Sequence, residues 1–471
     1  MVKIVYSMVK KSFINDFFLI GVILALTYLI FTFIGLSPHT FFILGGLAIF
    51  FIAFFRTDFA LVVLIFSMLL SPEFGVGHAG GREVMVRLDD IFLFIVFLGW
   101  MAKMAVSKEL GLLRISSLNL PILAYIAVCI ISSILGILRG EVTFKGSIFY
   151  ILKYVEYFLV FFMVTNNIRD MEQIKKFIFY MIFVCFLISL YAWFSHSSGA
   201  ERVSAPFEGK SGEPNTLGGY LLLLIMVCIG LLLNLEQRNY KIFLFLVIFF
   251  AFPAFLFTLS RGSWLGFILG YPVLIFLTKK GKTVLLGIFI ILLFLSSVVF
   301  PKYVYKRVQE TFSKRTERTI LGRRFNIDPS AAARIDTWRE GIKLWSKSPF
   351  WGHGVGIAGS VVDNEYTRIL IEVGLIGFAA FFWIILTLFK HSFINLRLLE
   401  YDNFSNGIIA GFSAGLVGLL GHCLSAGTFI IIRIMEPFWF FAAIVMLLPE
   451  LINETSPSAS PEGAAGGGSE T

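Results

Sequence analysis

The chain alternates between long apolar stretches and short polar ones over most of its length. A run of about 20 apolar residues can cross a bilayer as a helix. The uninterrupted runs predict helices near 13–35, 119–138, 145–165, 175–195, 217–234, 241–259, 262–278, 283–300, 366–389, 405–427 and 434–450. The pattern therefore predicts an all-α polytopic membrane protein.

Two further stretches set the number of helices. The apolar run 40–71 is broken by Phe55-Arg56-Thr57-Asp58, which predicts two short helices, and another helix fits about 90–105. The whole chain then has about 12–14 transmembrane helices, the lower number applying if short helices merge or re-enter the membrane.

Two polar segments interrupt this pattern. Residues 301–362 are too long and too polar for a simple turn, and 331–346 carry an apolar stripe with helical spacing. Such a helix is suited to lie in the membrane interface. The sequence thus predicts one membrane domain, 1–452, containing the long loop 301–362. The tail 453–471 is rich in Gly, Ser and Pro and is predicted to be disordered.

The basic residues of the short loops predict the orientation. With an even number of helices they fall on one side, and short cytoplasmic loops collect Lys and Arg. Both termini are then cytoplasmic, and the loop 301–362 lies on the opposite, outer side. Long loops can cross regardless of charge, and a basic loop over a membrane cavity suits an anionic lipid head group. Its basic residues are Lys302, Lys306, Arg307, Lys314, Arg315, Arg318, Arg323, Arg324, Arg334, Arg339, Lys343 and Lys347.

The composition agrees with a membrane protein and excludes several other classes. Hydrophobic residues make up 58% of the chain and charged residues only 15%, against about 25% charged in soluble domains. The net charge of +9 comes from loop residues and does not indicate nucleic-acid binding. The four cysteines lie in apolar runs without metal-ligand spacing. The chain has no nucleotide-binding fingerprint or catalytic triad pattern, so no cofactor is predicted.

Arg261 is the first candidate for chemistry, because it stands between two apolar helices in the sequence Ser260-Arg261-Gly262. An arginine at membrane depth costs about 2.5–3.5 kcal/mol on insertion scales and suggests a functional role. Guanidinium groups match phosphate oxygens. The alternative is an interfacial arginine that extends to the head groups.

Other candidates lie in the polar segments before membrane helices. Arg202 and Asn215 flank the loop before the helix at 217, and Asn215 is equally compatible with a helix cap. Arg334 and Trp338 are four residues apart and share a helix face, which would hold Arg334 at head-group height.

The sequence Asp363-Asn364-Glu365 places three polar side chains at the start of another membrane helix. Either Asp363 or Asn364 could cap that helix. Alternatively, a carboxylate facing arginines could accept the proton of an attacking sugar hydroxyl. The pair Asp89-Asp90 is also compatible with a cap or, less favourably, with a metal site.

Several of these motifs together resemble the O-antigen ligase and polymerase superfamily of membrane glycosyltransferases. The first is R-x-x-x-P-F, from Arg202 to Phe207, followed by P-N-x-L-G-x-Y-L from Pro214. The second is the Ser-Arg-Gly of Arg261. The third is P-x-x-G-x-G-x-G from Pro349, downstream of Arg334 and Trp338. In the fourth, Asn364 is followed by nine residues and Gly374-Leu-Ile-Gly377. The motifs occur in family order over about 200–390. The family has His before the motif Asn, where this chain has Asp363.

The resemblance implies a fold of the membrane-embedded glycosyltransferase type (GT-C-like) and a specific chemistry. It implies transfer of a glycan from undecaprenyl diphosphate, without a metal and with inversion at the anomeric carbon. Arg261 and Arg334, together with Arg202, would bind the donor diphosphate, and Asp363 would be the base. Asn215, Asn364 and Trp338 would support the site.

The resemblance also sets the expected partners and location. They are an undecaprenyl-diphosphate-linked oligosaccharide, a glycan or lipid A–core acceptor and membrane lipid, at the outer face of a bacterial cytoplasmic membrane. Because Asp363 replaces the ligase histidine, a polysaccharide polymerase is favoured over an O-antigen ligase. A flippase or transporter of lipid-linked oligosaccharide is the rival from another class. The absence of internal repeats and the scarcity of charged residues within the predicted helices argue against it.

Overall fold

The structure is a computed structural model that describes residues 38–79, 82–108, 113–208, 212–294, 305–307, 309, 316–320, 323–327, 329–359, 362–399 and 402–455. The predicted helix 13–35 lies outside these residues. Most of the predicted disordered tail, from 456 onward, also lies outside them, while its first three residues continue the last helix.

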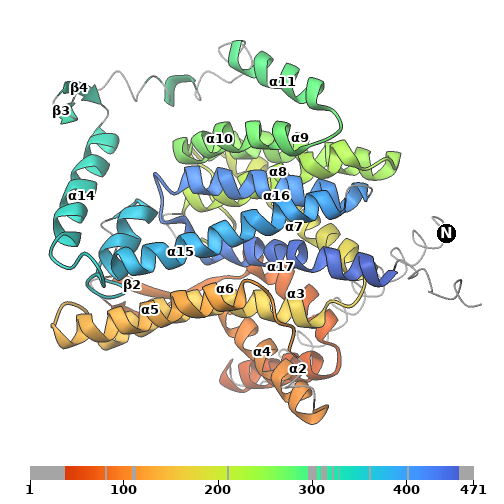
Figure 1. Cartoon of the computed structure of the whole chain (residues 1–471), viewed down its shortest axis with the longest axis horizontal. Coiled ribbons are helices and arrows are strands. Elements are labelled where there is room, and N and C mark those ends of the chain that lie inside the picture. The colour runs from red at the N-terminus through yellow and green to blue at the C-terminus, as the bar shows by residue number, and fades with distance from the viewer. Residues whose placement is uncertain are drawn as a thin grey trace, which may run out of the picture.

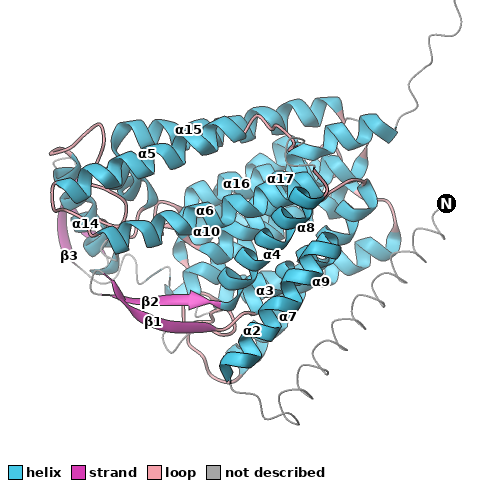
Figure 2. Cartoon of the chain, turned by 90° about the horizontal axis from the view of Figure 1, so that it is seen from below, coloured by secondary structure: helices cyan, strands magenta, loops and turns pink. Residues whose placement is uncertain are grey.

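The described residues form a bundle of helices, and the predicted all-α polytopic membrane fold is confirmed (Figures 1 and 2). Eight of the described helices are long and apolar enough to cross a membrane, and four shorter helices are also apolar. The helices are α2 (Pro38–Phe55), α3 (Thr57–Leu70), α4 (Leu88–Val106), α5 (Asn119–Leu138), α6 (Phe144–Asn167), α7 (Met171–Ser197), α8 (Pro214–Asn234), α9 (Arg238–Phe257), α10 (Arg261–Leu277), α11 (Lys282–Phe294), α14 (Pro329–Trp345), α15 (Glu365–Leu398), α16 (Asn403–His422), η2 (Thr428–Ile430) and α17 (Ile432–Thr455).

Two small β-hairpins lie between helices, and neither of them was predicted from the sequence. β1 (Glu73–Ala79) pairs antiparallel with β2 (Arg82–Arg87), and β3 (Thr316–Ile320) with β4 (Arg323–Ile327). A Gly-Gly pair separates the first two strands in the sequence, which is a hairpin signal. Figures 1 and 2 both place α14 and the β1–β2 hairpin at the same end of the bundle.

The centre of the bundle is built from α8, α10 and α16, which come together through glycines. A Cβ atom on Gly230 of α8 would lie 2.3 Å from the carbonyl oxygen of Gly407 in α16. One on Gly266 of α10 would lie 2.3 Å from the carbonyl oxygen of Gly418. Helices in membranes associate through such close backbone contacts between small residues. These contacts bring segments more than 150 residues apart in the sequence side by side (Figure 1).

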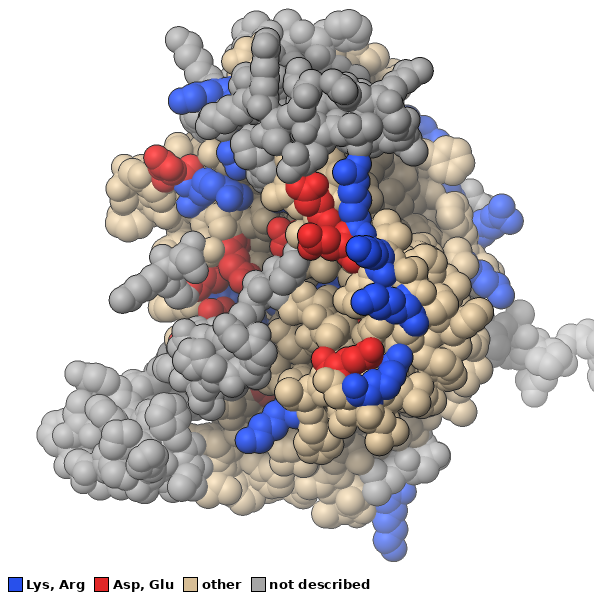
Figure 3. All heavy atoms as spheres, turned by 90° about the vertical axis from the view of Figure 1, so that its left-hand side faces the viewer, with Lys and Arg blue, Asp and Glu red and all other residues tan. Residues whose placement is uncertain are grey.

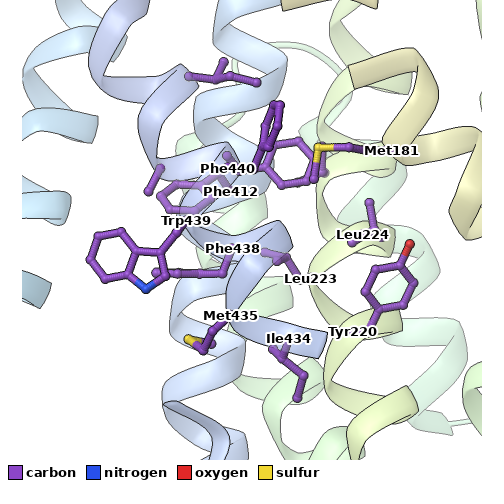
Figure 4. Close-up of a cluster of buried hydrophobic side chains, with 14 of the residues drawn as sticks. Met181, Tyr220, Leu223, Leu224, Phe412, Ile434, Met435, Phe438, Trp439 and Phe440 are labelled. Carbon is purple, nitrogen blue, oxygen red and sulfur yellow. The ribbon is translucent and has the colours of Figure 1, made fainter. Parts of the chain in front are cut away.

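An aromatic cluster fills the space between α17 and this centre. Phe438, Trp439 and Phe440 of α17 are almost fully buried. The ring centroids of Phe438 and of Phe412 in α16 are 5.3 Å apart. Figure 4 shows Phe412 and Phe440 between α17 and the side chains of α8, whereas Trp439 points to the opposite side. There the Trp439 ring packs against Phe158 of α6. Aromatic side chains bury large areas and dominate such contacts, so α17 is a central helix of the fold.

The predicted P-x-x-G-x-G-x-G turn packs against a break in α15. Gly374 has φ +64°, so the helix is interrupted there. The backbone N–H of Leu375 donates to the carbonyl of Pro349 at 2.9 Å, and that of Gly354 donates to the carbonyl of Glu372 at 2.9 Å. The turn therefore satisfies backbone groups that the break would leave without partners, and it fixes α14 to the first half of α15.

Candidate functional site

Four arginines line one small pocket at the start of α10. The pocket measures about 80 Å³ and is lined by Arg202, Asn215, Leu259, Arg261, Gly262, Arg307, Arg334 and Ser425. We call it the arginine pocket. It includes all three predicted diphosphate-binding residues, Arg261, Arg334 and Arg202, together with Asn215.

Arg261 is placed in the pocket by the first turn of α10. Ser260 is the N-cap, and its side chain accepts a hydrogen bond from the N–H of Ser263. Leu259 before it has φ +50°, a left-handed conformation that is uncommon for leucine. A Cβ atom on Gly262 would lie 1.6 Å from Oγ of Ser425. Only glycine allows this contact, which closes the pocket on the side of α16.

Arg202 forms another wall with Asn215. Its Nε donates to the carbonyl of Thr258 at 3.1 Å, and one terminal nitrogen donates to Oδ1 of Asn215 at 3.4 Å. The N-cap of α8 is Glu213, so the structure does not support the alternative that Asn215 caps this helix. Asn215 instead lies in the first turn and holds Arg202 toward the pocket.

Arg334 reaches the pocket from α14, on a different element from the other arginines. Its Nε lies 4.0 Å from Oδ2 of Asp363, whose side chain is 62% exposed. Asp363 stands beside Arg334 but is not among the residues that line the pocket. The two groups proposed for donor binding and proton transfer are therefore neighbours, with the carboxylate at the solvent side.

The concentration of positive charge is the main electrostatic feature of the pocket. Burial lowers the pKa of the Arg202 guanidinium, and the nearby charges of Arg307, Arg261 and Arg334 lower it further. Like charges held this close repel one another, so a bound anion would relieve the repulsion. Figure 3 shows basic side chains beside acidic ones on the face at this end of the bundle.

Asn364 and Trp338 lie near the site without lining the pocket. The side chain of Asn364 caps α15 by accepting from the N–H of Thr367 at 2.9 Å. Its amide nitrogen donates to the carbonyl of Leu424 at 3.2 Å. Of the two alternatives for Asp363 and Asn364, the cap is thus Asn364. Trp338 is half-buried on α14, one turn after Arg334.

Sequence reasoning missed Arg307, Ser425 and Leu259. Arg307 is one of twelve basic residues in the loop 301–362, and nothing local distinguishes it from the others. Ser425 follows α16 and lies more than 160 residues from Arg261 in the sequence, so its place in the pocket depends on how α10 packs against α16.

Charged residues also occur inside the helices, contrary to the expectation from the sequence. Glu365, Arg368 and Glu372 on α15 are all almost fully buried. Arg368 pairs with Glu365, and Glu365 accepts from the N–H of Phe429 at 3.0 Å. Their spacing of three and four residues places them on one helix face. The sequence already shows this spacing, which could have predicted a charged helix face, but Glu365 was interpreted only as part of the helix start.

The pair Asp89-Asp90 has a structural role. Asp89 is fully buried, pairs with Arg87 at 2.5 Å and accepts from Ser71 at 2.8 Å. Asp90 accepts from the backbone N–H of Arg87 at 2.9 Å, closing the start of α4. Within the described ranges, no three His, Cys, Asp or Glu residues are grouped as a metal site would require. This geometry fits a helix cap better than a metal site.

Comparison with known proteins agrees with the motifs. Residues 246–382 match a family model described as O-antigen ligase. The matched segment includes Arg261, Arg307, Arg334 and Asp363. It also includes the part of α15 that contains the break at Gly374. The resemblance to the O-antigen ligase and polymerase superfamily is therefore confirmed, and it indicates a glycosyltransferase-type enzyme in a membrane. No curated protein matches the chain.

Proposed function

We propose that this O-antigen ligase-type membrane protein is a polysaccharide polymerase that uses an undecaprenyl-diphosphate-linked glycan as donor. The observation that carries the proposal is the arginine pocket, in which four guanidinium groups from separate parts of the chain meet. A diphosphate carries negative charge on several oxygens, and guanidinium groups bind such oxygens through paired hydrogen bonds.

The donor would enter from the membrane with its diphosphate in the arginine pocket. Arg261, Arg334 and Arg202 would bind the phosphate oxygens, and Arg307 adds a fourth positive group. We place the pocket at the outer face of a bacterial cytoplasmic membrane with both termini cytoplasmic, as the loop charges predict. The sugar chain would then extend away from the membrane, where the acceptor is found.

The reaction would be a direct displacement at the anomeric carbon. The acceptor hydroxyl oxygen forms a bond to that carbon, the bond from the carbon to the phosphate oxygen breaks, and undecaprenyl diphosphate leaves with the electron pair. The configuration inverts. Preorganised cations stabilise the charge that develops on the leaving group. The arginines can supply this stabilisation themselves, so we propose a reaction without a metal cofactor.

Asp363 would receive the proton of the acceptor hydroxyl. It lies beside Arg334 and is exposed, so an incoming sugar can reach it while the donor occupies the pocket. A base must come within hydrogen-bond distance of the proton that it accepts. Asn364 supports this arrangement by fixing the start of α15, and Trp338 lies on the same helix as Arg334.

The test gives the purified protein an undecaprenyl-diphosphate repeat unit as its only substrate, in detergent and without added metal. A polymerase produces a ladder of products on a gel, and Arg261→Ala abolishes it. Arg339→Ala is the matched control, because Arg339 is an exposed arginine of α14 that does not line the pocket. An intact ladder in Arg261→Ala would disprove the role of the arginine pocket.

The second candidate is an O-antigen ligase, which the description of the matched family model favours. A ligase gives no ladder from the donor alone but transfers the glycan once a lipid A–core acceptor is added. The same assay therefore separates the two candidates by the acceptor that is required.

A flippase or transporter remains the rival from another class. Scarcity of charged residues no longer argues against it, because the buried Glu365, Arg368 and Glu372 lie within a membrane helix. A transporter moves its substrate without forming a glycosidic bond. Product formation in detergent, where both substrates share one solution, would therefore exclude it as the main activity.

A further inference from the structure

A buried arginine outside the arginine pocket joins three elements. Arg433, at the start of α17, is 2% exposed. Its terminal nitrogens donate to the carbonyl of Pro206 at 3.0 Å and to Oε1 of Glu73 at 3.0 Å. They also approach the carbonyls of Ser71 at 3.4 Å and Phe207 at 3.5 Å. Arg433 thus connects α17, the start of the β1–β2 hairpin and the loop before α8.

Glu208 lies next to Arg433 and closes that loop. One carboxylate oxygen accepts from the backbone N–H of Ala205 at 3.2 Å and of Glu213 at 2.7 Å. The other oxygen lies 3.6 Å from Arg433, and both side chains are almost fully buried. The backbone N–H groups and the guanidinium offset part of the cost of burying the charged carboxylate.

The closed loop carries one wall of the arginine pocket. Arg202 lies three residues before the first N–H that Glu208 binds, and Asn215 lies two residues after the second. The loop is also tied to the end of α9, because the N–H of Val203 donates to the carbonyl of Phe257 at 3.2 Å. Arg202 itself bonds Thr258 and Asn215.

We infer that Glu208 and Arg433 are positioning residues that hold Arg202 and Asn215 at the wall of the arginine pocket. They do not line the pocket themselves, so they would act through the loop. The inference rests on the proposed function, because the quantity they control is binding of the donor diphosphate. It adds to that function a part of the chain outside residues 246–382, the segment that the family model matches.

A purely structural role would give a different result from a positioning role. If the pair only stabilised the fold, its loss would weaken every activity equally and independently of Arg202. If it positions Arg202, then removing Arg202 first should remove most of its effect. Neighbouring residues that act together give non-additive effects in a double-mutant cycle, whereas independent residues give additive ones.

The experiment measures equilibrium binding of radiolabelled undecaprenyl diphosphate to the purified full chain in detergent. We expect Glu208→Ala to raise the Kd about tenfold, since it removes both backbone hydrogen bonds of the loop. Glu208→Gln should raise the Kd less than Glu208→Ala. Its amide oxygen can still accept from both N–H groups, although the NH₂ group replaces the oxygen that faces Arg433. Glu208→Asp keeps the charge but is too short to reach both, so it should behave as Glu208→Ala.

The double-mutant cycle gives the decisive comparison. Glu208→Ala should add little to the effect of Arg202→Ala. In the Arg334→Ala background it should keep its full effect, because Arg334 lies on α14 and is not held by the loop of Glu208. Equal additivity in both backgrounds, or an unchanged Kd in Glu208→Ala and Glu208→Asp, would overturn the inference. If wild type itself does not bind undecaprenyl diphosphate, the proposed donor binding is wrong. Should Glu208→Ala fail to fold, the contrast between Glu208→Gln and Glu208→Asp decides.

Discussion

The arginine pocket and the buried arginines of α15 and α17 put the same side chain to different uses. Arg368 is surrounded by acidic groups, with Glu365 beside it and Glu372 one turn further along the helix. Arg433 likewise faces Glu73 and Glu208. The pocket instead brings Arg202, Arg261, Arg307 and Arg334 together, with the exposed Asp363 at its edge.

The difference shows that the neighbours of a membrane arginine, more than its depth, indicate its role. A buried guanidinium that is matched by carboxylates completes a structural network, and removing it leaves those charges uncompensated. A group of guanidiniums that face one another has excess positive charge, which favours binding of an anion. Substitution of Arg368 should therefore act mainly on stability, and substitution of the pocket arginines mainly on activity. Arg433, which we infer to position Arg202, should affect donor binding as well.

The largest effect is expected where a buried pair of carboxylates loses its arginine partner. Arg368→Met should destabilise the protein by about 3–5 kcal/mol, because Glu365 and Glu372 would remain buried. Thermal unfolding in detergent can be followed by a thiol-reactive dye, since all four cysteines are free and buried. Glu236→Gln, which breaks an exposed ion pair with Lys280, is the control and should change little. An unchanged unfolding temperature for Arg368→Met would remove the distinction between the two groups.

Arg261→Ala should show the opposite behaviour. We expect the transfer rate to fall about 10²–10³-fold, as when one preorganised charge-stabilising group is lost. The unfolding temperature without donor should change much less than in Arg368→Met, because Arg261 lines a pocket instead of being matched to buried carboxylates. Rates and unfolding temperatures measured on the same preparation test both parts. A fall in stability that matched the loss of rate would place Arg261 with the structural arginines.

Arg307 sharpens the comparison, because only the tertiary structure places it in the pocket. Arg307→Ala should reduce donor binding by about tenfold, the value of one charge-assisted hydrogen bond. The matched control is Lys306→Ala, which removes the neighbouring exposed charge and should leave the Kd unchanged. Equal effects of the two substitutions would mean that the loop attracts the donor by general charge alone.

The smallest effect concerns pH. Burial raises the pKa of Glu208 to about 7, against the opposing charge of Arg433. A carboxyl group with a raised pKa in the folded state stabilises the protein at low pH, and this contribution is lost as the pH rises through 7. Between pH 6 and 7 it should amount to about 1 kcal/mol. The unfolding temperature of wild type should therefore fall over this range relative to that of Glu208→Gln. Parallel pH profiles would show that Glu208 titrates elsewhere.

Much of the fold was predictable because its signals are local. The break at Phe55-Arg56-Thr57-Asp58 separates α2 from α3, and the amphipathic pattern at 331–346 corresponds to α14. The hairpin β1–β2 was not predicted, because a short paired ribbon gives a weak signal among long apolar runs. The buried charges of α15 were missed for a related reason, since an apolar average over a helix hides three charged residues on one face.

The residues of the candidate site also separate into those with a local sequence signal and those without one. Arg261, Arg334, Arg202 and Asn215 could be singled out because each stands in a short motif at the edge of an apolar run, where a charge is costly. The choice of Arg307 among twelve basic residues, the approach of Ser425 to Gly262, and the connection from Arg433 to the loop of Arg202 depend on contacts between distant segments. Hydrophobic length and periodicity place helices in a membrane, whereas close packing of glycine-rich helices decides which polar side chains meet.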